Sequence, residues 1–193
     1  SFKFWAQRGT YSQVGRSLEV DGSVRVLNQD LDLNADRLRY TMRDGLVAIP
    51  AELKGGFFRG RIQAVDLKYR LDDGAFSVGP VSWSGTLQAS EIAPSRNRWT
   101  IKASGGSRPP GDIEVWTNAE ATDGEVIVKA KRLERNVKSD VLVASGDVRY
   151  FSADADLLCT KATVYRREKR AVLEGQVSMY VKPEQSRKLE VTE

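Results

Sequence analysis

"GSVRV" at 22–26 is the stretch that decides the fold, because the chain repeats it as "GPVSW" at 79–83, "GDVRY" at 146–150 and "GQVSM" at 175–179. Each copy has glycine, a variable residue, valine, a small or charged polar residue and a large apolar residue. Apolar residues at every second position are typical of a strand with one buried face. Glycine before such a strand is typical of a corner, where positive φ or close backbone approach excludes a side chain. The phrase therefore predicts a bend followed by a half-buried strand.

A second pattern precedes most of the glycine phrases. It runs apolar residue, alanine, leucine and tyrosine, as in "LNADRLRY" at 33–40 and "IQAVDLKY" at 62–69, with related copies at 128–135 and 158–165. Strict alternation would separate alanine and leucine by two positions, but here they are three apart. We therefore expect the strand to kink or change face between them. A sharp corner leaves room for a methyl group and little more, which accounts for the alanine.

The repeats predict an all-β protein. Turn signals such as "RDG", "DDG" and "TDG" recur at short intervals, and no long stretch keeps a helical period. The chain has 193 residues, of which 40% are hydrophobic, and we expect on the order of a dozen strands in one domain spanning 1–193. Two repeat groups, 1–90 and 112–182, are expected to be joined by an irregular loop or an inserted hairpin at 94–112, a segment rich in Gly, Pro and Ser. Residues 183–193 are either a tail or the start of a further unit.

The composition excludes several kinds of catalytic site. Histidine is absent, which excludes a Ser/His/Asp triad, a Cys/His pair and a histidine-based zinc site. The single cysteine, Cys159, forms neither an intrachain disulfide nor a thiolate metal cage. We therefore predict a protein without metal or other cofactor and without enzymatic activity. A carbohydrate-active enzyme with two carboxylates stays formally open, because the chain has 26 acidic residues.

The charge pattern argues against a nucleic-acid partner. Lys and Arg number 30 against 26 Asp and Glu, and the two signs are interspersed to a net charge of +4. The densest basic run, "RREKR" at 166–170, lies between two apolar alternations where a turn belongs. We expect a solvated turn there in preference to a phosphate-binding patch.

The two-part unit resembles the OstA-like domains of the LptA–LptC lipopolysaccharide-transport family. The resemblance is strongest at 128–151 and 157–181 and extends in weaker form over most of the chain. It implies an elongated, folded-over antiparallel sheet, a β-taco or β-jelly roll, whose faces enclose an apolar groove for acyl chains. It also implies lipopolysaccharide or another acylated lipid as a partner, and homologous β-modules that pair through edge strands. The implied location is the periplasm, with either an inner-membrane anchor or a cleaved signal upstream of this chain.

The inward side of the repeated strands is the candidate groove lining: Val24, Val26, Leu33, Ile62, Leu67, Val81, Val128, Leu133, Val148, Tyr150, Val177 and Met179. The same side chains would form a dry core if the two faces close tightly. The four tryptophans, Trp5, Trp83, Trp99 and Trp116, are candidates to line a lipid or sugar site, but we expect them instead to pack at the ends of the β core. We therefore predict an envelope protein that binds lipid acyl chains and takes part in lipid transport to the outer membrane. The alternative is a β-repeat scaffold that assembles edge to edge without a lipid.

Overall fold

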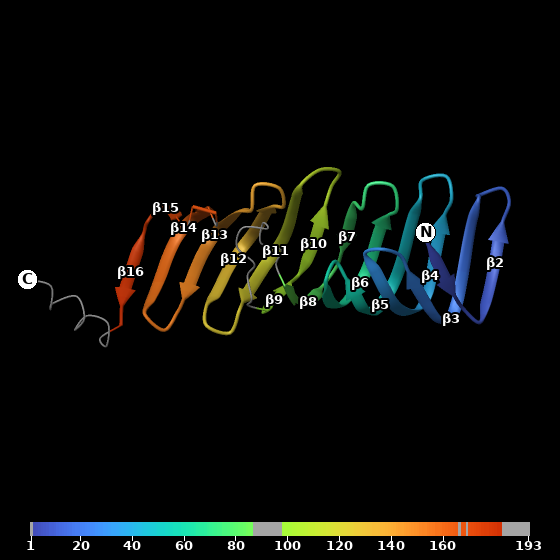
Figure 1. Ribbon diagram of the computed structural model, residues 1–193, viewed down its shortest axis with the longest axis horizontal. Helices are drawn as coiled ribbons and strands as arrows, with labels where there is room; N and C mark the ends of the chain where they lie inside the picture. The colour runs from blue at the N-terminus through green and yellow to red at the C-terminus, as the bar shows by residue number, and fades with distance from the viewer. Residues whose placement is uncertain (1, 87–97, 166, 169, 183–193) are drawn as a thin grey trace, which may run out of the picture.

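The chain folds into one antiparallel β-sheet, shown in Figure 1. The computed structural model describes residues 2–86, 98–165, 167–168 and 170–182, and within these ranges all sixteen regular elements are strands. No helix long and apolar enough to cross a membrane occurs in the same ranges. The predicted all-β class is confirmed. The strands are β1 (Lys3–Trp5), β2 (Arg8–Ser12), β3 (Ser17–Leu27), β4 (Leu31–Thr41), β5 (Leu46–Phe57), β6 (Gly60–Arg70), β7 (Phe76–Val78), β8 (Val81–Thr86), β9 (Arg98–Ala103), β10 (Gly105–Arg108), β11 (Ile113–Thr122), β12 (Ile127–Asn136), β13 (Val141–Phe151), β14 (Ala155–Tyr165), β15 (Arg170–Glu174) and β16 (Ser178–Val181).

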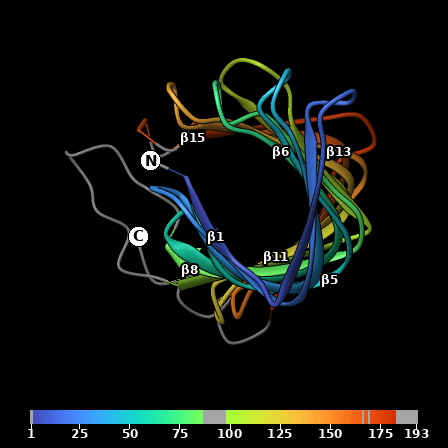
Figure 2. The same cartoon turned by 90° about the vertical axis from the view of Figure 1, so that its right-hand side faces the viewer.

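The long strands bend near their middle, and the sheet folds over into two layers (Figure 2). The bends coincide with register shifts, for example between Asp21 and Val24 in the β3–β4 pair and between Ser145 and Val148 in the β13–β14 pair. The short strands each lie in one layer. By their pairing, β2, β7, β10 and β15 lie in one layer, and β1, β8, β9 and β16 lie in the other; Figure 2 shows β15 in the upper layer and β1 and β8 in the lower layer. The two halves of one strand therefore face each other across the interior.

Glycine makes the corners, as the repeated phrase predicts. A Cβ at Gly146 would lie 2.9 Å from Cβ of Lys131 on the neighbouring strand, so the corner has no room for a side chain. Gly79 keeps an ordinary φ, but a Cβ there would lie 3.0 Å from the carbonyl oxygen of Val65. Three corners place two successive residues at positive φ, namely Gly22 and Ser23 (82° and 51°), Gly146 and Asp147 (75° and 51°), and Gly175 and Gln176 (68° and 45°).

The alanine–leucine spacing marks bends as well. Between Ala64 and Leu67, which are both buried, Asp66 has a φ of 57°. The register of the β12–β13 pair shifts between Lys129 and Arg132, which flank Ala130 and precede Leu133. The extra residue turns the strand so that the alanine and the leucine both point inward. The predicted change of face is confirmed.

One predicted boundary was wrong. The segment at 94–112 was expected as an irregular loop or an inserted hairpin, but β9 and β10 occupy 98–103 and 105–108 and pair with β8, β7 and β11. The glycines at 105 and 106 suggested a turn. In the structure they are strand residues, and a Cβ at Gly106 would overlap the indole ring of Trp116 on β11. Residues 87–97, and with them part of the expected loop, lie outside the described residues, as does the tail at 183–193.

The core changes character along the molecule. Up to about β8 the two layers are packed together by large side chains, which are almost completely inaccessible: Val24, Val26, Leu31, Leu33, Leu38, Val47, Ile49, Leu53, Leu67 and Tyr69. From β11 onward the buried inward positions are held mostly by small residues: Ala119, Ala121, Ala130, Ala144, Ala155, Cys159 and Ala162. This difference positions the candidate site.

Candidate functional site

Along the open side of the folded sheet, its two long edges are not joined by backbone pairing in the described part of the chain, but in the N-terminal half side-chain contacts connect them. The ring of Phe2, beside the lower-layer strand β1, lies 5.4 Å from that of Tyr40 at the upper end of β4. Tyr69 on the upper part of β6 donates its hydroxyl hydrogen to Oδ2 of Asp30, in the loop at the lower edge, over 3.3 Å. These contacts join the two layers across a core of large buried side chains.

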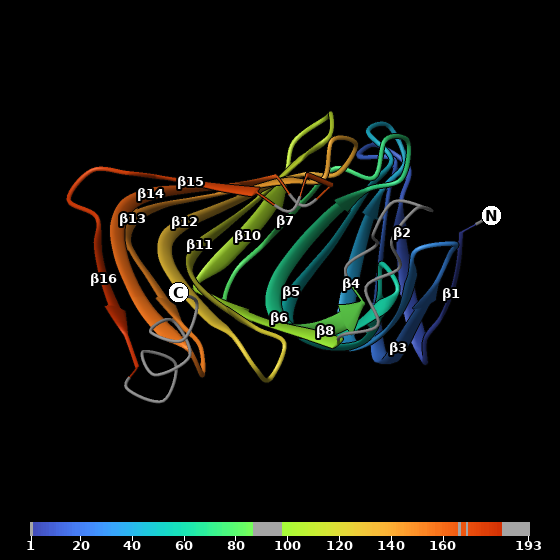
Figure 3. The same cartoon turned by 60° about the vertical axis from the view of Figure 1, so that its left-hand side comes forward.

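The C-terminal half contains a groove between the layers, with a volume of about 570 Å³. Figure 3 shows β11 to β14 curving from the upper layer into the lower layer around it. The lining is predominantly apolar and comes from both layers: Trp99, Ile101, Glu114, Trp116, Ala121, Val128, Leu133, Arg135, Leu142, Ala144, Val148, Tyr150, Ser152, Asp154, Ala155, Leu157, Cys159, Ala162, Val164, Arg170, Ala171, Leu173 and Met179.

Small inward side chains are the reason the groove exists. Ala144 on β13 pairs with Ala162 on β14, and both point into the groove. The equivalent part of the N-terminal half has Ile49 paired with Leu67, and both are fully buried. Two sheet layers lie about 10 Å apart, and methyl groups that project from one layer do not reach the other. The layers therefore stay separated by space that the protein does not fill.

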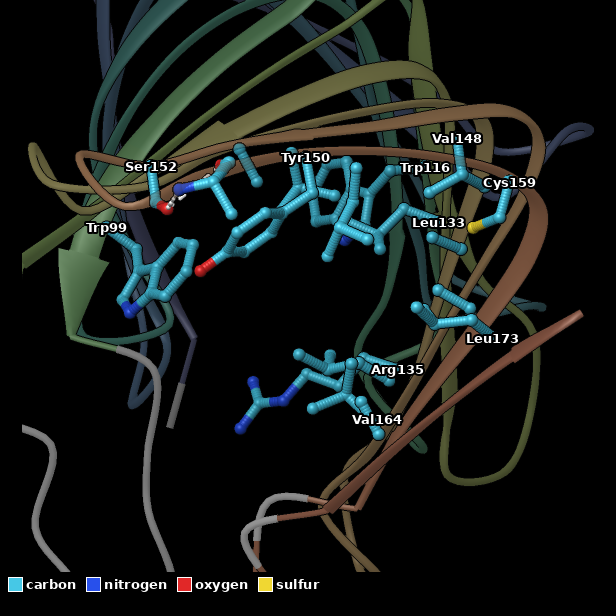
Figure 4. A pocket seen from close by; sticks show the side chains of 18 of the residues that line it. Trp99, Trp116, Leu133, Arg135, Val148, Tyr150, Ser152, Cys159, Val164 and Leu173 are labelled. Carbon is cyan, nitrogen blue, oxygen red and sulfur yellow. Dashed lines mark hydrogen bonds between the residues drawn. The ribbon is translucent and has the colours of Figure 1, made fainter. Parts of the chain in front are cut away.

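The side chains of the groove form two walls and a closed side (Figure 4). Trp99, Tyr150 and Ser152 lie along one wall, and Arg135 and Val164 lie on the opposite wall. Val148 and Cys159 lie where the strands bend. The polar lining residues, such as Arg170 and Asp154, belong to the strand ends and loops at the two margins, whereas the depth of the groove is hydrocarbon. This arrangement suits an amphiphile better than a polar solute.

The single cysteine is part of this lining. Cys159 is buried at the bend of β14, and desolvation by burial raises the pKa of its thiol. The thiol is therefore a poor nucleophile at neutral pH and acts as a small apolar side chain.

A cluster of charges lies beside the groove at its N-terminal end. Glu114 lies 3.7 Å from the guanidinium groups of both Arg108 and Arg135, and Arg135 lies 3.8 Å from Asp140. The Glu114 side chain is only 14% exposed, and desolvation by burial raises its pKa despite the two arginines. A smaller cavity of about 360 Å³ adjoins the cluster and shares Ile101, Glu114, Trp116 and Arg135 with the groove.

The structure divides the twelve sequence-predicted lining residues into three groups. Five of them line the groove: Val128, Leu133, Val148, Tyr150 and Met179. Six are buried in the packed N-terminal half, as the dry-core interpretation described: Val24, Val26, Leu33, Ile62, Leu67 and Val81. Val177 is 51% exposed and lies outside both regions, because it follows the corner that leads into β16 at the end of the described sheet.

Sequence reasoning missed the alanines, and for Trp99 and Trp116 it favoured packing in the core over a place in the lipid site. Trp116 is buried as expected, but it also lines both cavities, and Trp99 lies at the groove margin. Trp83 packs in the core as expected, whereas Trp5 is 50% exposed under the guanidinium of Arg25, so the core prediction was wrong for Trp5. The feature that could have indicated the groove is the smaller size of the buried inward side chains after residue 118. The repeat pattern defines which positions point inward but not how large their side chains are.

The described part of the chain contains no group of three or more Cys, Asp or Glu residues placed to hold a metal ion. The groove residues offer a predominantly apolar surface with charged residues at its ends. Such a surface binds hydrocarbon by removing it from water.

Comparison with known proteins finds similarity among solved structures. No protein-family model matches the chain, and no curated protein matches it. A solved structure to which it is similar is LptH. That protein, from Pseudomonas aeruginosa, is described as the LptA-homologous periplasmic component of the conserved lipopolysaccharide transport device. The match covers 95% of this chain and 96% of the LptH chain at 7% identity, with a TM-score of 0.27. Agreement at this level assigns no ligand and no residue role to the present protein.

Proposed function

We propose that this chain is a non-enzymatic lipid-binding module that holds acyl chains in its C-terminal groove. The observation that carries the proposal is the groove itself, about 570 Å³ of space between two sheet layers whose facing residues are alanine, valine and leucine. Such a volume holds roughly 20 methylene-sized groups at ~30 Å³ each, the volume of a water molecule in the liquid. One or two tails of a lipid fit this space.

Hydrocarbon burial supplies the binding energy. Each methylene moved from water into an apolar site contributes up to ~0.8 kcal/mol. A tail that fills the groove therefore outweighs the cost of immobilising one lipid molecule. The charged residues Arg170 and Asp154, which are both exposed, leave the polar end of the ligand at the open side, beside water.

The repeated sequence unit supports the biological setting of the proposal. Its resemblance to the LptA–LptC family points to the periplasm, and to lipopolysaccharide or a related acylated lipid on its way to the outer membrane. We propose the same cargo class and location here.

Photo-crosslinking at matched repeat positions tests the proposal. Val148 and Val24 both stand two residues after a corner glycine, but Val148 lines the groove and Val24 lies in the packed half. A small diazirine amino acid at position 148 is expected to become covalently attached to purified lipopolysaccharide on illumination. The same group at position 24 is expected to react only within the protein.

The surface position Lys138 gives the background of this experiment, since its side chain is 79% exposed and pairs with Asp112. Labelling at 148 that does not exceed labelling at 138 would contradict the proposed function.

The exposed end of the sheet favours a second candidate function, edge-to-edge assembly. β15 and β16 both pair with β14, and they form the C-terminal end of the sheet within the described residues. Met179 is 59% exposed and Tyr180 is 60% exposed on β16. Exposed strands with apolar side chains are surfaces on which another β-module adds a strand.

Light scattering separates the two candidates. A scaffold is expected to grow with protein concentration in the absence of lipid, whereas a lipid-binding module is expected to bind lipid while it remains monomeric at low concentration. Growth without lipid, together with unlabelled Val148, would establish the scaffold and remove the lipid-binding function.

A further inference from the structure

The groove ends against aromatic side chains on its N-terminal side. Phe57 on the lower part of β5 meets Phe76 on the upper-layer strand β7, with ring centroids 5.2 Å apart, and Phe76 lies 6.1 Å from Trp116 on β11. Phe57 and Phe76 thus connect one layer to the other, and Trp116 extends the contact to the groove. We call Phe57, Phe76 and Trp116 the aromatic wall.

The wall is held in place from both layers. Trp83 donates its indole hydrogen to the carbonyl oxygen of Phe57 over 3.0 Å, which fixes the lower end. At the other end, the ring of Trp116 lies against Gly106 of β10, where a Cβ would overlap it. Arg108 lies 5.6 Å over the ring of Phe76, which adds a cation–π contact at the open side.

Trp116 is the point at which the wall limits the groove. It lines both the groove and the smaller adjoining cavity, as do Ile101, Glu114 and Arg135, so these four side chains lie where the two spaces meet. Phe57 and Phe76 contribute to the smaller cavity only. Beyond the wall, the inward positions are filled by side chains such as Leu53 and Ile49, which leave no continuous path toward the N-terminus.

We propose that the aromatic wall makes the groove blind at this end, and that the Trp116 ring sets how far a bound acyl chain extends. The inference rests on the proposed function, because it assigns a limit to the same groove. It defines the ligand class as lipids whose buried tail is no longer than the distance from the groove margin to Trp116. It also means that a lipid enters and leaves through the open side or the C-terminal end, and does not travel the full length of this molecule.

A tail-length series tests the wall. Binding of octanoate, dodecanoate, palmitate, stearate and tetracosanoate to the unmodified chain is measured by isothermal titration calorimetry, so that the longest tail exceeds the roughly 20 methylene groups that the groove volume holds. The affinity is expected to rise by about fourfold per methylene, the factor that corresponds to ~0.8 kcal/mol, and then to stop rising once the tail reaches Trp116. An affinity that climbs at the same rate to the longest tail would overturn the blind groove.

Two variants are expected to move the limit in opposite directions. Trp116→Ala opens the groove toward the smaller cavity, so the affinity should continue to rise for longer tails. Gly106→Ala places a methyl group where the indole lies and pushes the ring toward the groove, so the rise should stop at a shorter tail. Trp5→Ala is the matched control, because Trp5 on β1 is 50% exposed and lines neither the groove nor the smaller cavity, so this variant should leave the limit unchanged.

The outcomes separate this inference from the proposed function. In one outcome, all tails bind, and the affinity stops rising at the same tail length in the unmodified chain, Trp116→Ala and Gly106→Ala. This result would overturn the role of Trp116 but not lipid binding. Absence of binding by every tail would overturn both. If Trp116→Ala does not fold, the opposite shift in Gly106→Ala still decides the matter, and the unmodified chain alone tests whether a limit exists.

Discussion

At the scale of single residues, the fold depends on glycines that have no room for a side chain. Gly146 combines two constraints, since its φ is 75° and its missing Cβ would contact Lys131. Gly124, in the turn between β11 and β12, has a φ of 97° but nothing within 4 Å of the missing Cβ. Comparing alanine substitutions at Gly146 and Gly124 therefore distinguishes the cost of backbone strain from the cost of steric crowding.

We predict that Gly146→Ala lowers the free energy of unfolding by more than Gly124→Ala does. Backbone strain alone costs about 1–2 kcal/mol for an alanine in the left-handed region. Crowding against Lys131 adds to this at Gly146 only, by about 1–3 kcal/mol if the neighbouring strand has to move. Urea denaturation measures both losses. Equal losses would show that the corner accepts a methyl group after all.

The turn between β6 and β7 gives a pH-dependent prediction. Asp73 accepts two hydrogen bonds from the Arg70 guanidinium, at 2.9 and 2.6 Å, and one from the backbone N–H of Ala75. These bonds to the charged form lower the pKa of Asp73 from 3.8 to about 2. The folded state therefore binds fewer protons than the unfolded state in this window, so the contribution to stability is present above pH 3.8 and is lost as the pH falls toward 2.

Asp73→Asn is expected to flatten the decline in stability over this acid range, as followed by circular dichroism during acid titration. Asp72→Asn removes a neighbouring carboxylate from the same turn and keeps the Arg70–Asp73 contact, so it should retain the decline. An unchanged acid limb in Asp73→Asn would show that the contact contributes nothing in solution.

At the scale of strands, the same bent unit produces a dry core in one half and a groove in the other. The bend itself was predictable, because the alanine–leucine spacing and the glycine phrase encode it locally. Which half stays open was not predictable from the repeat, since it depends on which side chain faces which across the fold. Ala144 and Leu67 occupy similar inward positions, and the strand alternation is the same around both. β9 and β10 were not predicted for a related reason. Gly106 is small because the Trp116 ring of a neighbouring strand lies against it, and this contact cannot be read from the local sequence.

A matched pair of small-to-large substitutions follows from this contrast. Ala64→Leu enlarges a side chain in the packed half, where overpacking costs about 1–3 kcal/mol. Ala144→Leu places the same side chain against unfilled space in the groove, so we expect stability to stay within about 1 kcal/mol of the unmodified chain and lipid binding to weaken. Thermal unfolding and palmitate titration of both variants check this. Comparable destabilisation by both would contradict a groove that is open in solution.

At the scale of the whole molecule, one continuous sheet contains a tightly packed N-terminal half and a C-terminal half with a groove. The N-terminal layers are joined by large buried side chains and by contacts across the open side, such as Tyr69 to Asp30. The C-terminal layers are connected through the bends of β11 to β14, and the space between them contains the groove. A ligand in the groove would make the apolar contacts that the small alanine side chains do not make. Binding should therefore stabilise one half far more than the other.

Hydrogen exchange measured by mass spectrometry tests this division of the molecule. Without lipid, we expect amides of the N-terminal strands at 31–70 to exchange more slowly than those of 127–165, because opening the packed half exposes more apolar surface. With saturating palmitate, added protection should be confined to 113–174 and should reach a free energy near that of binding itself, RT ln(1 + [L]/Kd). Ala144→Leu is the control, since a leucine in the groove should protect 127–165 before lipid is added and reduce the further gain. Protection spread evenly over both halves would mean that the ligand lies along the full length of the sheet, and that the aromatic wall does not divide the interior.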